Sequence, residues 1–169
     1  MKRLVDDGLM RLHLVQHAEA KRKEEDPLRP LSDKGWEDIR KVAKYAEKHL
    51  QIQVEQIVHS GKLRAKQTAD VLAEHLHPVK AVTVAEGLEP LADAKVWKNR
   101  LAGTTENIVI VGHLPHLSKL TCHLLTGDEG KGVIAFRMGG IICLQKDESG
   151  RWTIQWIITP EIIPVRGSV

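Results

Sequence analysis

The sequence predicts a single three-layer α/β/α sandwich whose central sheet is mostly parallel and has an antiparallel edge. Short apolar runs at residues 12–15 and 108–111 have the composition of buried strands. Longer segments between such runs carry apolar residues at helical spacing, and strands that alternate with helices form parallel sheets. The last third of the chain holds strand-like segments in succession, the final two separated by the turn sequence DESG at residues 147–150. That turn predicts a terminal hairpin, which supplies the antiparallel edge.

Local signals place the individual elements. Ser32 is a good N-cap, so the first helix is expected to begin there and to continue through the apolar residues that follow at helical spacing. A second helix is expected over residues 63–76 and a third over residues 93–101. Pro115 suits the start of a fourth helix, which Gly127 ends. Strands are expected at residues 12–15, 54–58, 81–84, 108–111, 133–136, 140–145 and 152–158.

The length of 169 residues fits one domain with a substantial core. We assign residues 10–169 to this domain, because the first strand begins directly after Met10, and residues 1–9 to an N-terminal extension. Hydrophobic residues make up 42% of the chain and charged residues 28%, as in ordinary soluble globular proteins.

Charge and hydropathy exclude several partners. The formal net charge of +3 suits an anionic ligand, but no basic face with interleaved aromatic residues predicts nucleic-acid binding. No apolar stretch is long enough to span a bilayer, and residues 1–10 lack the apolar core of a secretory signal. We therefore expect no membrane partner and a cytoplasmic location. Cys122 and Cys143 lie in apolar segments without C-x-x-C spacing and are expected to be buried thiols.

Polar side chains follow three of the predicted strands. His17 comes after the strand at residues 12–15, His113 after the strand at residues 108–111, and Arg64 shortly after the second strand. The carboxyl ends of parallel strands meet at one edge of an open α/β sheet, where ligands bind. If these three strands are neighbours, His17, Arg64 and His113 converge on one pocket.

The chemistry of these side chains points to phosphoryl transfer. Arg64 lies in the first turn of its helix, where free backbone N–H groups and the helix dipole favour an anion. Its planar guanidinium matches phosphate oxygens in a bidentate fashion. A neutral imidazole such as His17 can attack phosphorus and form a covalent intermediate. The second imidazole, His113, can donate to the oxygens as charge builds in the transition state.

The sequence argues against a metal site and against a glycine-rich phosphate-binding loop. His116 and His123 are seven residues apart on one helix, about 10 Å, which is too far for a shared metal ion. No H-x-x-x-H, H-E-x-x-H or carboxylate-rich set completes a site with His13 or His59. The phosphate-binding pattern G-x-x-x-x-G-K-[S/T] is also absent from the chain. We expect no metal ion and no cofactor.

Four segments, in this order along the chain, resemble the histidine phosphatase superfamily, whose fold is phosphoglycerate mutase-like. They are residues 14–20 (LVQHAEA), 29–32 (RPLS), 60–69 (SGKLRAKQTA) and 111–115 (VGHLP). The short chain and the segment LEP at residues 88–90 are similar to the small SixA-like phosphohistidine phosphatase branch. The larger phosphoglycerate mutases are disfavoured, because the chain lacks their long insertions.

The resemblance implies roles for individual residues. His17 would be the nucleophile that becomes phosphorylated, Arg64 and His113 would complete the phosphate pocket, and Arg29 would reach it from a loop. The implied activity is metal-independent removal of phosphate from phosphohistidine on a protein or from a small phosphorylated substrate.

The chain departs from the family pattern at two positions. Gln16 stands where the family has arginine, and Ala18 stands where it usually has glycine. The Gln16 amide can still donate to phosphate but carries no charge. Losing one preorganised donor typically lowers the rate about 10²–10³-fold. Two functions therefore stay open: a phosphatase weakened or re-tuned by Gln16, and a catalytically weak module that binds a phosphorylated ligand.

Overall fold

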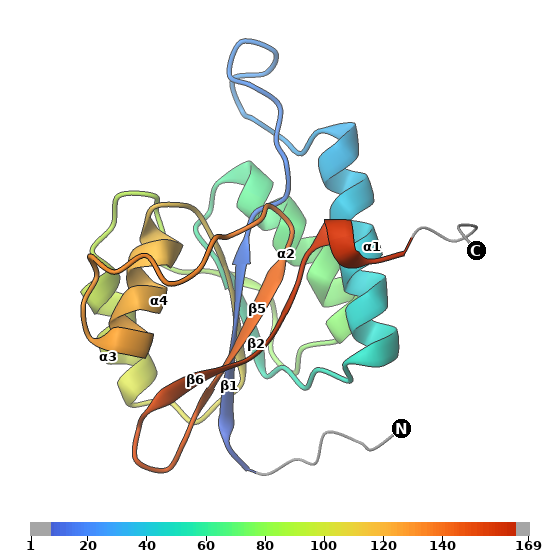
Figure 1. The fold of residues 1–169 in the computed structure, drawn as a ribbon. Coiled ribbons are helices and arrows are strands. Elements are labelled where there is room, and N and C mark those ends of the chain that lie inside the picture. Colours follow the sequence, from blue (N-terminus) through green and yellow to red (C-terminus); the bar gives the residue numbers. More distant parts are fainter. Residues whose placement is uncertain (1–7, 165–169) are drawn as a thin grey trace.

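The computed structural model describes residues 8–164, which form a six-stranded sheet between two layers of helices (Figure 1). The strands are β1 (Met10–Gln16), β2 (Gln56–His59), β3 (Thr83–Val84), β4 (Ile108–Gly112), β5 (Ile141–Lys146) and β6 (Trp152–Ile158). The helices are α1 (Asp33–His49), α2 (Leu63–Leu76), α3 (Ala94–Ala102) and α4 (His116–Thr126), with a 3₁₀ turn at Pro160–Ile162. Of the proposed N-terminal extension, residues 1–7 lie outside the described residues.

The strand order is β3-β2-β4-β1-β5-β6. Strands β1 to β4 pair in parallel, whereas β5 runs antiparallel to β1 and β6 antiparallel to β5. The predicted three-layer α/β/α sandwich with a mostly parallel sheet and an antiparallel edge is confirmed.

Each face of the sheet buries its own apolar core. Val15 of β1 packs with residues of α1 and α2, while Leu14 packs with residues of α3 and α4. Alternate strand residues point to opposite faces, so one strand serves both cores. Both Val15 and Leu14 are fully buried. This double burial fixes β1 in the centre of the sheet and thereby places its carboxyl end.

The start of α1 lies against the segment that follows β1. The Ser32 hydroxyl caps the helix by accepting a hydrogen bond of 3.0 Å from the backbone N–H of Gly35. A Cβ atom on Gly35 would come within 2.0 Å of the carbonyl oxygen of Glu19, so only glycine permits this approach. Between these contacts, residues 20–31 form a loop that projects from the body of the protein (Figure 1).

The predicted strand at residues 133–136 is wrong, since residues 131–137 form no strand. Ile134 and Phe136 instead pack, partly buried, against the core beneath α3 and α4. Their alternation reflects this packing on the face of the sheet. β5 already pairs with β1 and β6, which leaves it no edge for a further strand. The other predicted elements differ from the observed ones by a few residues at their ends.

No helix within residues 8–164 combines the length and hydrophobicity that crossing a membrane requires.

Candidate active site

The three strands that precede the predicted site residues are neighbours in the sheet. β4 lies between β1 and β2, and all three run in parallel. Gln16 is level with Gly112, and His59 is level with Val111. His17, His113 and the start of α2 therefore meet at one edge, the same edge from which the loop of residues 20–31 projects (Figure 1).

His17 is buried, with 8% of its surface exposed, and its ring is held in a defined orientation. Its Nδ1 lies 2.7 Å from the carbonyl oxygen of Ala18. A carbonyl oxygen only accepts hydrogen bonds, so Nδ1 carries the hydrogen and Nε2 keeps its lone pair in the neutral ring. Arg64 donates from Nε to this Nε2 over 3.2 Å. The nitrogen with nucleophilic character thus lies beside a cation.

His113 lies next to His17, with 5.0 Å between the ring centroids and an angle of 55° between the rings. It is buried, and its Nε2 lies 2.6 Å from the hydroxyl of Ser60. Within residues 8–164 its buried Nδ1 has no hydrogen-bond partner. No role is predicted for Ser60 from the sequence, although this residue follows β2 directly and begins the segment at residues 60–69.

Both imidazoles are neutral near pH 7. Burial lowers the pKa of His17 to about 4; the Ala18 carbonyl opposes this effect, and the charges of Arg64 and Arg29 add to it. Burial also lowers the pKa of His113 to about 3, with further contributions from His17, Arg64 and Lys62. The formal charges in both sets are positive, as expected for a site that takes an anion.

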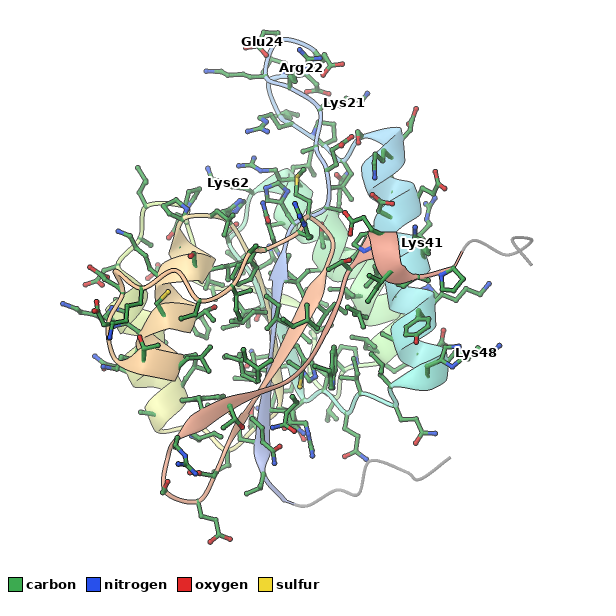
Figure 2. The ribbon with its side chains drawn as sticks, viewed as in Figure 1. Lys21, Arg22, Glu24, Lys41, Lys48 and Lys62 are labelled. Atoms are coloured by element: carbon green, nitrogen blue, oxygen red, sulfur yellow. The ribbon has the colours of Figure 1, made fainter. Side chains whose placement is uncertain are left out.

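Arg64 is half-buried, and its pKa is lowered by burial and then by the charge of Arg29. Within residues 8–164 its side-chain hydrogen bonds use only Nε, which leaves the two terminal nitrogens for a ligand. Lys62 is exposed at the same end of the molecule as the projecting loop (Figure 2). A lysine at this place adds to the positive potential without entering the buried part of the site.

Arg29 lies on the returning limb of the loop, with a φ of 51° in the left-handed region. Its Nε donates to the carbonyl oxygen of Lys21 over 3.1 Å. Its charge acts on His17 and on Arg64, so the guanidinium lies within electrostatic reach of both. The loop brings Arg29 towards the two groups that the sequence predicts as its partners.

Gln16 is half-buried at the end of β1, and its backbone contacts Gly139. Its carbonyl oxygen accepts from the N–H of Gly139 over 2.9 Å. The described residues provide no hydrogen-bond partner for its side chain. The phosphate contact expected of Gln16 therefore stays a prediction.

Four further histidines within residues 8–164 are buried. The rings of His13 and Trp156 pack at 43° to each other with 5.5 Å between their centroids, and His123 contacts Glu129 over 3.1 Å. His116 is fully buried at the start of α4, and His59 accepts from the N–H of Gly61. In the part of the chain that the structure describes, no three His, Cys, Asp or Glu side chains are grouped as metal ligands.

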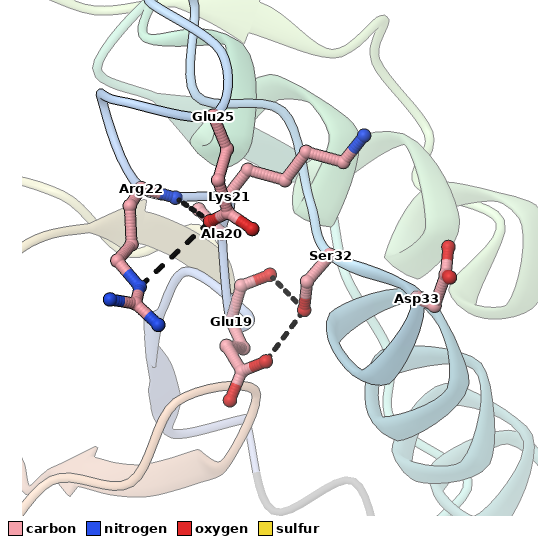
Figure 3. A pocket seen from close by; sticks show the side chains of 7 residues that line it. All are labelled: Glu19, Ala20, Lys21, Arg22, Glu25, Ser32 and Asp33. Atoms are coloured by element: carbon pink, nitrogen blue, oxygen red, sulfur yellow. Dashed lines mark hydrogen bonds and ion pairs between the residues drawn. The ribbon is translucent and has the colours of Figure 1, made fainter.

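A cavity of about 490 Å³ lies between the projecting loop and the start of α1 (Figure 3). Charges of both signs line it, including Glu19, Lys21 and Asp33. The Glu19 carboxylate accepts a hydrogen bond of 2.7 Å from the Ser32 hydroxyl there. None of the predicted catalytic side chains lines this cavity, so it is distinct from the site at the strand ends.

No protein-family model matches the chain. The phosphohistidine phosphatase SixA of Escherichia coli K12 is 26% identical over 156 residues, which span 89% of this chain and 94% of that protein. A solved structure of the protein histidine phosphatase SixA complexed with tungstate is also 26% identical, with a TM-score of 0.78. The matched region covers 89% of this chain and 97% of the chain in that structure.

More distant structures share the fold. A phosphohistidine phosphatase SixA described as putative, from Agrobacterium tumefaciens, is 19% identical with a TM-score of 0.72, covering 89% of this chain and 98% of its own. A putative α-ribazole-5′-phosphate phosphatase from Escherichia coli is 16% identical with a TM-score of 0.72, covering 92% of this chain and 100% of its own.

In sequence and in fold the chain is similar to members of the histidine phosphatase superfamily, and its fold is phosphoglycerate mutase-like. Within that superfamily it is SixA-like. The relatives are phosphatases, and they support a histidine phosphatase function for this chain.

Proposed function

We propose that the protein removes phosphate from phosphohistidine on a protein, or from a small phosphorylated substrate, through a covalent intermediate on His17. The observation that carries this proposal is the neutral His17 ring. Its Nδ1 is bound to the Ala18 carbonyl, and its Nε2 lies 3.2 Å from the Arg64 guanidinium. A fixed tautomer with its lone pair beside an anion-binding side chain is the arrangement that nucleophilic attack on a phosphoryl group requires.

In the first step the Nε2 lone pair of His17 attacks phosphorus, a P–N bond forms, and the bond to the leaving group breaks. The phosphorylated ring keeps its hydrogen on Nδ1 and becomes positively charged. The Ala18 carbonyl oxygen, 2.7 Å away, stabilises that charge. Water then attacks phosphorus, the new P–N bond breaks, and His17 returns to its neutral form with release of inorganic phosphate.

The positive groups around His17 stabilise the charge on the transferring phosphoryl oxygens. Arg64 would turn its terminal nitrogens to these oxygens when the substrate replaces the contact between Nε and His17. Arg29 would add a second guanidinium from the loop. His113, neutral and 5.0 Å from His17 between ring centroids, would donate one N–H bond to the phosphoryl group.

The leaving group follows from the charges at the site. The charged side chains that shift the pKa of His17 and His113 are cations, and neither histidine is protonated near pH 7. Such a site favours a leaving group that needs little help from an acid. Phosphohistidine meets this condition when its second ring nitrogen is protonated, because it then leaves as neutral imidazole. Glu86 and Glu89 are exposed and are assigned no role as acids.

A catalytically weak module that binds a phosphorylated ligand is the second candidate, and Gln16 is the observation that favours it. Gln16 occupies the end of β1, directly before the nucleophile, and lacks the charge of the family's arginine. Binding without turnover requires that the remaining cations hold the phosphate but do not stabilise the transition state enough for reaction.

Covalent labelling separates the two candidates. The protein is incubated with phosphoramidate or an aryl phosphate, denatured, and assayed for bound phosphate and for released phosphate. The phosphatase is expected to carry an acid-labile label that is lost in His17→Ala, and to release phosphate with or without a metal chelator. Binding of phosphate without label or release would favour the binding module. Equal labelling of wild type and His17→Ala would contradict a His17 intermediate.

A further inference from the structure

Three side chains on successive turns of α2 join different parts of the candidate site. Arg64, Gln67 and Thr68 are separated by three and four residues, so they share one face of the helix. Arg64 contacts His17. The other two contact the segments that carry His17 and Arg29.

Thr68 is fully buried and uses both hydrogen-bonding functions of its hydroxyl. Its Oγ1 accepts from the N–H of Ala18 over 3.0 Å and donates to the carbonyl oxygen of Arg64 over 2.7 Å. Ala18 is also the residue whose carbonyl holds Nδ1 of His17. One hydroxyl therefore links the residue that orients the nucleophile to the residue that carries the guanidinium.

Gln67 makes the corresponding contact with the other limb of the projecting loop. Its Oε1 accepts from the N–H of Leu31 over 2.8 Å. Leu31 is buried, and its backbone also bridges to Ala20 at the base of the loop. Arg29 lies two residues before Leu31. The hydrogen bond between Leu31 and Gln67 therefore fixes the position of the loop segment that carries Arg29 relative to α2.

We propose that Gln67 and Thr68 are positioning residues, with Thr68 fixing His17 and Gln67 fixing Arg29 in relation to the Arg64 guanidinium. The inference rests on the proposed function, in which those three groups hold the phosphoryl group. Neither positioning side chain touches the substrate. Thr68 determines the position of His17 for attack on phosphorus. Gln67 determines how closely Arg29 approaches the bound anion, and therefore the affinity for it.

The two roles give different kinetic signatures. Thr68→Val keeps the shape and removes the hydroxyl, and it is expected to lower kcat about ten- to hundredfold by misplacing His17. Thr68→Ser is expected to restore kcat to within about threefold of wild type. Gln67→Met removes the acceptor for Leu31 and is expected to raise KM, and the Kd for tungstate, about fivefold, as for one lost hydrogen bond.

The experiment measures kcat, KM, tungstate Kd by calorimetry and melting temperature for these variants, for Arg29→Met and for Gln67→Met with Arg29→Met. Lys66→Met is the matched control, because Lys66 is an exposed neighbour on α2 that pairs with Asp70. When Arg29 is already replaced by Met, adding Gln67→Met is expected to change KM and the tungstate Kd little. Fully multiplicative effects in the double variant would overturn the role of Gln67. A folded Thr68→Ser as impaired as Thr68→Val would overturn the role of the hydroxyl.

The proposed function and this inference fail in different ways. A wild-type protein that binds tungstate but neither turns over nor becomes labelled contradicts the phosphatase alone. Tungstate affinity then tests Gln67, since Gln67→Met should still weaken it while Lys66→Met does not. The ¹⁵N NMR signals of the His17 ring test Thr68, since Thr68→Val should shift them while Thr68→Ser and Lys66→Met do not. A wild-type protein that binds no tungstate contradicts both proposals.

Discussion

His13 lies in the middle of β1 and His17 directly after its last residue, and the surroundings of the two histidines differ. Both are buried, and burial lowers the pKa of each to about 4. His13 is level with Cys143 in the sheet, and its ring packs at an angle against that of Trp156. His17 lies past the last residue of β1, with its tautomer fixed by Ala18 and its Nε2 facing Arg64.

The comparison teaches that a low histidine pKa does not by itself mark a catalytic group. Burial produces the same pKa shift in the core of the sheet and at its edge. Two further features distinguish His17: its place directly after a strand end, and the hydrogen bond from the Arg64 guanidinium to its Nε2. The following tests vary one of these features at a time.

Substitution of each histidine tests the comparison most strongly. His17→Ala is expected to lower turnover by about 10³-fold or more, because it removes the nucleophile. His13→Leu keeps an apolar group of similar size and is expected to leave kcat and KM within about threefold of wild type. Steady-state phosphate release checks both. Comparable losses in the two variants, with both folded, would remove the distinction between core and edge.

Removal of the neighbouring cation is the next largest effect. Arg64→Met is expected to lower kcat/KM about 10²–10³-fold, since one preorganised donor to the phosphoryl group is lost. Tungstate affinity measured by calorimetry should fall in parallel. Lys66→Met on the same helix serves as control, and equal behaviour of the two variants would argue against an anion site at Arg64.

Acid should destabilise the fold through both histidines. The folded pKa of each is about 4 and the unfolded value is 6.5, so between these pH values the unfolded chain binds protons that the folded chain does not. The free energy of unfolding is therefore complete above pH 6.5 and falls as pH drops towards 4, by up to about 1.4 kcal/mol per pH unit for each histidine. Urea unfolding from pH 7 to 4.5 measures this slope. His13→Leu should make it shallower without changing turnover, and an unchanged slope in that variant would contradict a neutral buried His13.

The smallest expected effect concerns the charge before the nucleophile. Gln16→Arg is expected to raise kcat/KM roughly tenfold, because it adds a cation directly before the nucleophile. A steady-state assay against aryl phosphate and phosphohistidine checks this. An active wild type that Gln16→Arg does not improve would show that the glutamine amide is a sufficient substitute.

The sequence predicts the framework of the site because strand ends and helix starts are local features. The apolar runs before His17 and His113 indicate two buried strands, and parallel pairing brings their ends together. The contact between Ser60 and His113 joins residues 53 positions apart and has no local signal. The approach of Arg29 depends on a left-handed backbone conformation and on Gln67, which periodicity does not reveal. The segment at residues 133–136 has the alternation of a strand, but the strand that follows it, β5, already has partners on both sides.

The central claim is that Nε2 of His17 is the atom that receives the phosphoryl group. ³¹P NMR of the wild-type protein during incubation with phosphoramidate measures this directly, because phosphate on Nε2 and on Nδ1 of histidine gives separate signals. The account predicts one Nε2-phosphohistidine signal that is present in His13→Leu and missing in His17→Ala. A signal from phosphate on Nδ1, or one that persists in His17→Ala, would contradict it.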